Sequence, residues 1–341
     1  MRKRGERTAG CERKNRAEKA GGRELYGAEI LPGKACSESG ADRIWRKLGL
    51  AERIGTHATN IRMLNRAILD RAGTFDILFV VKGNFVTADT LRRLKARGDA
   101  PRIIGWSCDD VYLPHNSSVV LREAAPSYDI FYTAKSLNIS QGELAKMGFR
   151  DARFLHQGFD CEMHRPLPDP DSRFAGLITF VGFGEEDRFN KMNYLARNGI
   201  EVHVWGNGWT RAMRARADQR LHIHARPLFG DDYADALSNS AINLCFLRKL
   251  NRDLHTSRSF EIPACGGFMV AERTDEHRAY FEEDAEAVYF DDTRELLDKV
   301  QYYLRHPEQR VSIAAAGRQR CLDSDYSYHR LARDMIEGRV S

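Results

Sequence analysis

Short apolar runs alternate with helix-length amphipathic segments along most of the chain. The run Phe75–Val81 is apolar almost throughout and is followed by a Lys-Gly pair, which is typical of a buried strand in a parallel sheet. Apolar side chains at Ile61, Leu64, Ile68 and Leu69 recur at helical spacing and predict a helix with one buried face. Strands that alternate with helices of this length predict βαβ units and a doubly wound α/β fold.

The same pattern predicts the remaining elements. Further strands are expected at residues 28–31, 102–107, 129–133, 153–156, 177–182, 200–205, 221–224, 241–247, 268–271 and 287–290. Further helices are expected at residues 44–50, 87–97, 117–125, 139–147, 190–197, 210–217, 233–237, 276–282, 294–305, 307–321 and 328–337, with a short one beginning between 257 and 260.

One segment interrupts this alternation. Residues Gln157–Arg173 contain three prolines and show no periodicity, so they predict a connection between two domains. We therefore expect a disordered basic tail at residues 1–22, a first domain at 23–160, a linker at 161–174, a second domain at 175–325 and a terminal helical segment at 326–341.

Composition is consistent with two domains and narrows the possible partners. The chain has 341 residues, 42% of them hydrophobic, which suffices for a sizeable core. No apolar run approaches the ~20 residues of a transmembrane segment, and seven scattered cysteines predict reduced thiols, so we expect a cytoplasmic protein. The first twenty residues hold eight Lys or Arg and three Glu and thus account for the formal net charge of +5. The rest is near neutral, which predicts no nucleic-acid partner.

The stretch Asp253–Val270 has the strongest signs of a binding site. Arg258 and Glu261 lie three residues apart and would share one helix face, ahead of a turn at Gly266 and Gly267 where backbone can approach a ligand. The first N–H groups of this short helix could receive an anion such as a diphosphate. The alternative is a surface helical pair in which Asp253 or Thr256 is only an N-cap.

This stretch, DLHTSRSFEIPACGGFMV, resembles the nucleotide-sugar-binding motif of GT-B glycosyltransferases of the family 4 type. Glu261 matches the second acid of that motif, and Asp253 stands where the first, usually Glu, would be. The longer run RSFEIPACGGFMVAERTDEHRAYF resembles the CgeB-like spore-maturation group. The resemblance implies a GT-B fold, in which two Rossmann-like domains face a central cleft and the last helix crosses back to the N-terminal domain.

Donor-binding candidates follow two strands of the second domain, where ligands of open α/β sheets bind. In VGFGEEDRFNK, the resemblance implies that Lys191, with Arg188 as a substitute, holds the diphosphate; Phe183 replaces the family's first Arg. The turn Gly206-Asn207-Gly208-Trp209 resembles the family's Gly-x-Gly-Trp turn. For VGFGEEDRFNK, the alternative is a tight turn at Gly182 followed by a solvated basic pair. For the second turn, the alternative is an isolated glycine pair without a binding role. The donor-side candidates are Gly182, Arg188, Lys191, Gly206, Gly208, Arg258, Gly266 and Gly267.

Acceptor-side candidates follow two strands of the first domain. WSCDDVYLPHNSS resembles the Asp-Asp stretch of the CgeB-like group, which implies acceptor binding by Asp109 and Asp110 with His115 as a possible proton acceptor; loop capping is the alternative. Thr133 and Lys135 follow the next strand, where a helix N-cap with a solvated Lys is the alternative. The family's first strand and glycine turn are not visible, so the first domain could be shortened.

Other chemistry finds little support in the sequence. Adjacent acids point to opposite sides of an extended segment, so Asp109 and Asp110 do not form the metal-binding Asp-x-Asp of GT-A enzymes. His222 and His224 alternate on a strand and are interpreted as packing or sheet-edge residues, so no metal is expected. GxSxG and Walker motifs are absent, which argues against hydrolases and ATPases.

The resemblance therefore implies a metal-independent glycosyltransferase of the hexosyltransferase type that retains anomeric configuration. Arg258 and Lys191, with Arg188 behind them, would stabilise the departing diphosphate. Glu261 would bind the ribose and Asp253 the donor sugar. The partners would be a nucleotide-diphospho-sugar, which is a substrate and not a cofactor, and a glycan, lipid or protein acceptor. A non-catalytic nucleotide- or glycan-binding relative and a sugar-nucleotide epimerase stay open.

Overall fold

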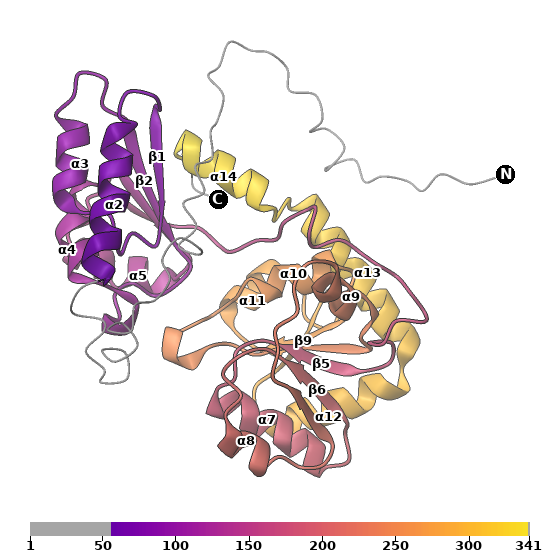
Figure 1. The fold of residues 1–341 in the computed structure, drawn as a ribbon. Helices are drawn as coiled ribbons and strands as arrows, with labels where there is room; N and C mark the ends of the chain where they lie inside the picture. Colours follow the sequence, from indigo (N-terminus) through magenta and orange to yellow (C-terminus); the bar gives the residue numbers. More distant parts are fainter. Residues whose placement is uncertain (1–55, 340–341) are drawn as a thin grey trace. The chain divides into compact units, whose positions relative to one another are not determined.

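The computed structural model describes residues 56–339, which form two compact units. The N-terminal unit comprises residues 56–155 with 338–339, and the C-terminal unit comprises residues 156–337 (Figure 1). The basic tail, the strand expected at 28–31 and the helix expected at 44–50 lie outside the described residues.

The N-terminal unit is built on a four-stranded parallel sheet in the order β1-β2-β3-β4. Its strands are β1 (Ile77–Val81), β2 (Arg102–Ser107), β3 (Ile130–Thr133) and β4 (Ala152–Phe154). Its helices are α2 (Thr56–Asp70), α3 (Ala88–Lys95), α4 (Val119–Ala124), α5 (Ser136–Ser140) and α6 (Glu143–Lys146). Helical segments connect each strand to the next, and consecutive strands pair side by side.

The expectation that β1 is a buried strand is wrong within the described part of the chain. β1 is the edge strand of its sheet, and Phe79 and Val81 are 42% and 55% exposed. Only Val80 of this strand is buried. An apolar run shows that a segment is hydrophobic, but it does not show where the strand lies in its sheet. That position depends on pairing between distant segments.

The helix expected at 139–147 is divided in two. Gly142 lies between α5 and α6 with a φ of +63°, a left-handed conformation that ends one helix and precedes the next. L-residues adopt this conformation at a cost of roughly 1–2 kcal/mol, whereas glycine adopts it freely. The apolar spacing continues across the break, which explains why periodicity alone predicts one helix.

The C-terminal unit is a six-stranded parallel sheet in the order β10-β9-β8-β5-β6-β7. Its strands are β5 (Ile178–Val181), β6 (Val202–Trp205), β7 (Leu221–His224), β8 (Ile242–Cys245), β9 (Met269–Glu272) and β10 (Val288–Phe290). The chain moves outward from β5 to β7 and then returns to the other side of β5 with β8. The order therefore reverses between β5 and β8, and ligands of open α/β sheets bind beyond the carboxyl ends of strands at such a switch point.

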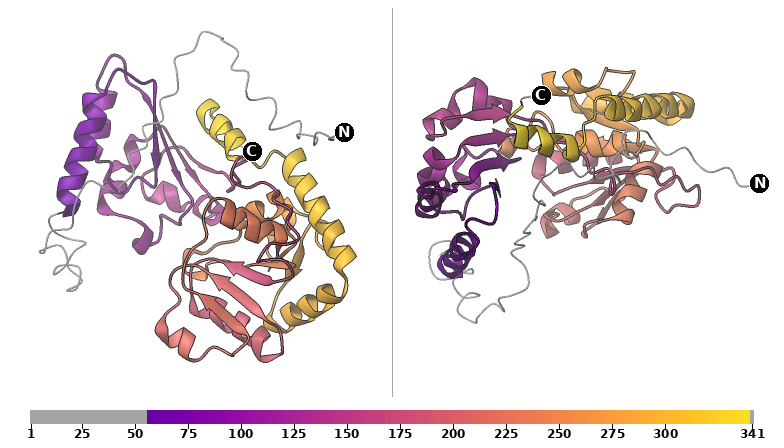
Figure 2. Two further views of the ribbon diagram at one scale, coloured as in Figure 1. Left: turned by 45° about the vertical axis from the view of Figure 1, so that its right-hand side comes forward. Right: turned by 90° about the horizontal axis from the view of Figure 1, so that it is seen from above.

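Helices cover both faces of this sheet (Figures 1 and 2). The helices of the unit are α7 (Glu186–Arg197), α8 (Arg211–Ala215), α9 (Asp231–Asn239), α10 (Arg258–Ala264), α11 (Asp275–Tyr280), α12 (Thr293–Arg305), α13 (Pro307–Asp323) and α14 (Tyr328–Glu337). Side chains of α7, α8 and α12 form the core on one face, and those of α9 and α10 pack against β8 and β9 on the other. Every helix of the described chain is too short or too polar to cross a bilayer.

Residues 161–174 run along α9. The Leu167 N–H donates to Ser238 Oγ at 3.1 Å, and the Asn239 side-chain amide donates to the Leu167 carbonyl at 2.8 Å. The Ser172 hydroxyl donates to Asp235 at 2.7 Å. These bonds give the backbone of a proline-rich segment fixed partners within the C-terminal unit.

Replacing Gly142 by alanine tests the helix break. A Cβ at this position meets no atom within 4 Å, so the backbone conformation alone opposes the substitution. We expect Gly142→Ala to lower the free energy of unfolding by about 1–2 kcal/mol in urea titrations. Gly98→Ala is the matched control, because it also meets open space and has no positive φ. Equal stability of the two variants would contradict this explanation.

Candidate functional site

Helix α10 is fixed to the C-terminal unit by Phe260. This side chain is fully buried, and its ring lies 5.1 Å from Tyr280, 5.1 Å from Tyr326 and 5.2 Å from His156, measured between ring centroids. Aromatic contacts at these distances add to the free energy gained by burial. Because Phe260 is locked, the side chains of the first turn of α10 emerge in fixed directions.

Ser259 and His277 join the same helix to α11 through a buried hydrogen bond of 2.7 Å. His277 Nδ1 lies 2.6 Å from the Glu272 carbonyl and can only donate to it, so Nε2 accepts from the Ser259 hydroxyl. Ser259 Oγ in turn accepts from the Thr256 N–H at 3.1 Å. Burial lowers the pKa of His277 to about 4, which keeps the ring neutral.

Three of the first N–H groups of α10 are already engaged by backbone carbonyls. The Ser259 N–H donates to the Thr256 carbonyl, and the N–H groups of Phe260 and Glu261 both donate to the Ser257 carbonyl. The N–H of Arg258, the first residue of the helix, is not among these bonds. An anion beside α10 would therefore meet this group and the neighbouring side chains.

Arg258 extends from the first turn of α10 to the carboxyl end of β5. Its Nε donates to the carbonyl of Val181, the last residue of β5, and its Nη1 to Thr256 Oγ1 at 3.3 Å. Burial opposes the charge of this guanidinium, but the neighbouring Tyr233 and Glu261 outweigh that effect and raise its pKa. The structure thus puts a stable cation at the carboxyl end of β5, beside the switch point.

Glu261 lies one helical turn from Arg258 and is positioned by two aromatic residues. The hydroxyl of Tyr233, on α9, donates to Glu261 Oε2 at 2.6 Å. His164 accepts the Asp160 N–H on Nδ1, so its Nε2 carries the proton and faces Glu261 Oε1 at 3.7 Å. Burial and the Glu261 carboxylate raise the pKa of Tyr233 well above its ordinary value, so the hydroxyl stays a donor.

Arg188 acts inside the fold. It is 3% exposed, and its guanidinium donates to the carbonyls of Phe183 at 3.0 Å, Phe246 at 3.1 Å and Leu247 at 3.4 Å. These carbonyls lie just after β5 and β8, so Arg188 ties the two strands together at the switch point. Burial and the nearby charge of Arg258 lower its pKa.

Lys191 is engaged by carboxylates. Its Nζ forms an ion pair with Asp187 and lies 3.7 Å from Oε1 of Glu272, the last residue of β9. Lys249 pairs with the other oxygen of Glu272. Glu272 is only 6% exposed. Its carboxylate therefore holds Lys191 and Lys249 together beyond the carboxyl ends of β8 and β9.

The turns that follow β5 and β6 approach each other so closely that Gly206 and Gly208 have no room for a side chain. A Cβ on Gly206, whose φ is +143°, would lie 2.0 Å from the Gly182 carbonyl oxygen. A Cβ on Gly208, at φ +83°, would meet the Phe183 ring at 2.6 Å. The two turns therefore interlock at the carboxyl edge of the sheet, together with Arg258.

Gly266 and Gly267 do not join this cluster. They follow α10 and precede β9, and a helix between two parallel strands returns to the amino ends of the strands. The expected backbone approach to a ligand at this turn is therefore wrong for a ligand at the carboxyl edge. A Cβ on Gly267 would lie 2.3 Å from the Leu237 carbonyl oxygen, so packing explains this glycine.

Asp253 organises the loop after β8. Its Oδ2 accepts from the Arg248 N–H at 3.2 Å, and its Oδ1 accepts from the Asn251 side chain at 2.8 Å. Arg252, which lies between Asn251 and Asp253, adopts a left-handed φ of +48°. The carboxylate thus stabilises a strained turn close to Arg258.

In the N-terminal unit, Asp109 and Asp110 have different partners. Asp109 pairs with Lys82 at 2.5 Å. Asp110 is fully buried and accepts from the Asn138 amide at 2.8 Å, and the Asn138 carbonyl oxygen accepts from the Thr133 hydroxyl at 3.0 Å. Asp110 and Thr133 are thereby brought together in a buried network at the carboxyl ends of β2 and β3.

Lys135 is 3% exposed and its N–H donates to Thr133 Oγ1 at 3.1 Å. The alternative of a solvated Lys is therefore wrong. His115 is exposed on the 3₁₀ turn Pro114–Asn116 and does not belong to the buried network. Asp109 and His115 are the more accessible members of the predicted acceptor set.

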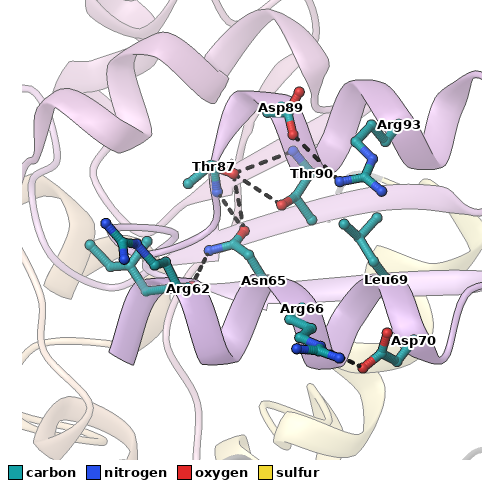
Figure 3. Close-up of a pocket in the computed structure, with 10 residues that line it drawn as sticks. Arg62, Asn65, Arg66, Leu69, Asp70, Thr87, Asp89, Thr90 and Arg93 are labelled. Atoms are coloured by element: carbon teal, nitrogen blue, oxygen red, sulfur yellow. Dashed lines mark hydrogen bonds and ion pairs between the residues drawn. The ribbon is translucent and has the colours of Figure 1, made fainter. Parts of the chain in front are cut away.

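A separate groove of about 410 Å³ lies between α2 and α3 (Figure 3). Asn65 crosses it, donating to the Phe85 carbonyl at 2.8 Å and accepting from the Thr87 N–H at 2.9 Å. None of the site residues predicted from the sequence lines this groove. Its contacts fasten α2 to the start of α3.

Sequence reasoning missed Tyr233, His164 and Glu272. Glu272 could have been found, because it ends a strand at the ligand-binding edge of the sheet. His164 lies in the segment interpreted as a linker, and Tyr233 lies on a predicted helix with no motif around it. Both meet Glu261 only through tertiary packing.

With this geometry established, comparisons identify the fold. Residues 190–337 match the family model described as glycosyl transferase-like. No curated protein matches the chain significantly. Similar solved structures include Anabaena HepE in complex with UDP-glucose, with 13% identity, 81% of each chain covered and a TM-score of 0.57. The chain has the GT-B fold.

Two further structures share this fold. A glycosyltransferase from Rickettsia africae is 10% identical, with 88% of this chain and 87% of that chain covered and a TM-score of 0.59. A putative UDP-N-acetylglucosamine 2-epimerase from Listeria monocytogenes is 12% identical, with 82% and 77% covered and a TM-score of 0.52. The fold therefore accommodates more than one reaction.

Arg188→Met tests the structural role of this guanidinium. The variant leaves buried carbonyls without their donor, so we expect the free energy of unfolding to fall by about 3 kcal/mol. Arg211→Met, at an exposed position of α8, is the control and should change it by less than about 0.5 kcal/mol. Equal stability of the two variants would show that Arg188 does not brace the strands.

His277 predicts a dependence of stability on pH. Its folded pKa of about 4 lies below the ordinary value of 6.5, so between these pH values the unfolded chain binds the extra proton. The stabilisation is thus complete above pH 6.5 and is lost as the pH falls towards 4. In urea titrations from pH 7.5 to 4.5, His277→Gln should be less stable than wild type at pH 7.5 and show a shallower decline. Parallel curves would rule out this contribution.

Proposed function

We propose that the protein transfers a sugar from a nucleotide-diphospho-sugar to an acceptor. The observation that carries this proposal is the placement of Arg258 and Glu261 in one turn of α10, with Arg258 bonded to the carboxyl end of β5. This is the edge of a doubly wound sheet where nucleotides bind. HepE, which shares the fold, was crystallised in complex with UDP-glucose, and a UDP-sugar is therefore the first donor to test.

The departing nucleoside diphosphate carries negative charge that the site must stabilise. Arg258 supplies a fixed cation in a partly buried setting, where electrostatic stabilisation is stronger than in water. Lys191 is the second cation in this proposal, and it would exchange an ion pair with Asp187 or Glu272 for the diphosphate. The proposal requires no metal ion, because these side chains supply the positive field.

The carboxylates serve recognition in this scheme. Glu261 accepts hydrogen bonds from the ribose hydroxyls, with Tyr233 fixing the orientation of its other oxygen. Asp253 contacts the donor sugar from its loop. The N-terminal unit binds the acceptor through Asp109, Lys135 and neighbouring groups, with His115 as the proton acceptor.

The resemblance of the α10 motif to family 4 and to the CgeB-like group supports a hexosyltransferase that retains anomeric configuration. That assignment is part of the proposal. The substitution of Asp for the usual Glu at position 253 is the feature that bears most directly on it, because a shorter carboxylate reaches the donor sugar differently.

Glu261→Gln tests the proposal with labelled UDP-, GDP- and ADP-sugars. We expect sugar transfer or donor hydrolysis by the wild type and a loss of about 100-fold or more in the variant, because the amide cannot replace the carboxylate as a double acceptor. Tyr233→Phe should lose roughly 10-fold, since it frees the Glu261 carboxylate to rotate. Glu308→Gln, an exposed position on α13, is the control.

The turnover assays, combined with a thermal-shift measurement, separate the glycosyltransferase from the two alternative functions. A nucleoside diphosphate at about 100 times its dissociation constant adds roughly 2.7 kcal/mol to stability, which a thermal shift detects. Such stabilisation without turnover would indicate a non-catalytic relative, and a changed free sugar nucleotide would indicate an epimerase. Undiminished turnover by Glu261→Gln would refute the assigned site.

A further inference from the structure

Three histidines and a glutamate gather on one face of the sheet at β6 and β7. In the register of these parallel strands, His203 lies beside His222 and Trp205 beside His224. Side chains alternate between the faces of a strand, so Glu201 and His203 share a face with these neighbours. Val202 and Leu221 point to the opposite face, where they join the hydrophobic core.

The donor atoms of these side chains are close together. One ligand atom from each of Glu201, His203 and His222 lies within 4.8 Å of the other two. His203 Nδ1 also lies 3.3 Å from His224 Nε2. Two ligands of a tetrahedral zinc ion, each bonded at about 2.0–2.1 Å, are roughly 3.3 Å apart. These spacings approach those of zinc ligands, so the side chains need only reorient to surround one ion.

We propose that Glu201, His203 and His222 form a zinc-binding site, with His224 adjacent to it. Two imidazole nitrogens and one carboxylate oxygen are ligands that Zn²⁺ accepts, and water completes a tetrahedral shell. The site is on the edge strand β7 and its neighbour, and it is independent of the proposed sugar transfer. We propose that the site binds a metal ion, and we assign it no catalytic role.

Side-chain geometry defines what binding requires. The rings of His203 and His222 stack with centroids 4.5 Å apart and planes 25° from parallel. A metal lies in the plane of each ligating ring, so one imidazole turns about its Cβ–Cγ bond on binding. Both rings are only partly buried and Glu201 is exposed, so the ion and the turning ring have room. Trp205 and His224 stack at 4.5 Å and brace the inner side of the cluster.

Zinc titration of the full chain tests the proposal. Protein stripped with a chelator is titrated with ZnCl₂ in competition with a chromogenic indicator. We expect the wild type to bind one zinc ion per chain that the double variant His203→Asn/His222→Gln does not bind. The affinity of the double variant for this ion should be at least about 30-fold lower. The variant keeps every cysteine, so thiol-bound zinc is the same in both proteins. His329→Gln, which changes an exposed histidine on α14, should bind zinc as the wild type does.

A second variant protects the test against misfolding. Glu201→Gln changes an exposed side chain and should weaken zinc binding about 10-fold while leaving the melting temperature without metal unchanged. The proposal is overturned if the wild type binds no zinc beyond that of the double variant. If the double variant does not fold, equal affinity of Glu201→Gln and wild type overturns it.

Discussion

The burial of Phe260 is the constraint on which the candidate site depends. Its ring occupies an aromatic pocket formed with Tyr280 and Tyr326, and the neighbouring Ser259 is bonded to the neutral ring of His277. These two contacts fix a helix that is too short to be stable in isolation. Because the inner face of α10 is locked, Arg258 and Glu261 have defined positions at the edge of the sheet.

Buried cations are stabilised here by the carboxyl ends of parallel strands. Arg188 uses carbonyls that follow β5 and β8, and Arg258 uses the last carbonyl of β5. The two arginines differ in their surroundings: Arg188 is enclosed, whereas Arg258 stands beside Glu261 and the loop of Asp253. Arg188 therefore holds the switch point together, and Arg258 is the cation that the proposed function assigns to the diphosphate.

Several residues chosen for their chemistry turn out to serve the fold as well. Asp110 and Thr133 are joined through Asn138 in the N-terminal unit, and buried polar groups are stable only when paired in this way. Gly206 is required because its backbone touches that of Gly182. A polar residue or glycine after a strand marks the correct edge of the sheet, but it does not separate ligand contacts from internal ones.

The sequence alone determined the alternation of strands and helices in the described chain, because apolar periodicity is a local property. It also placed Arg258 and Glu261 on one short helix. Only the tertiary structure showed that β1 is an edge strand among the described residues, that Gly266 and Gly267 return to the amino edge, and that Tyr233 and His164 meet Glu261. It likewise brought His203 beside His222 from another strand. These facts depend on pairing between distant segments, which local spacing does not encode.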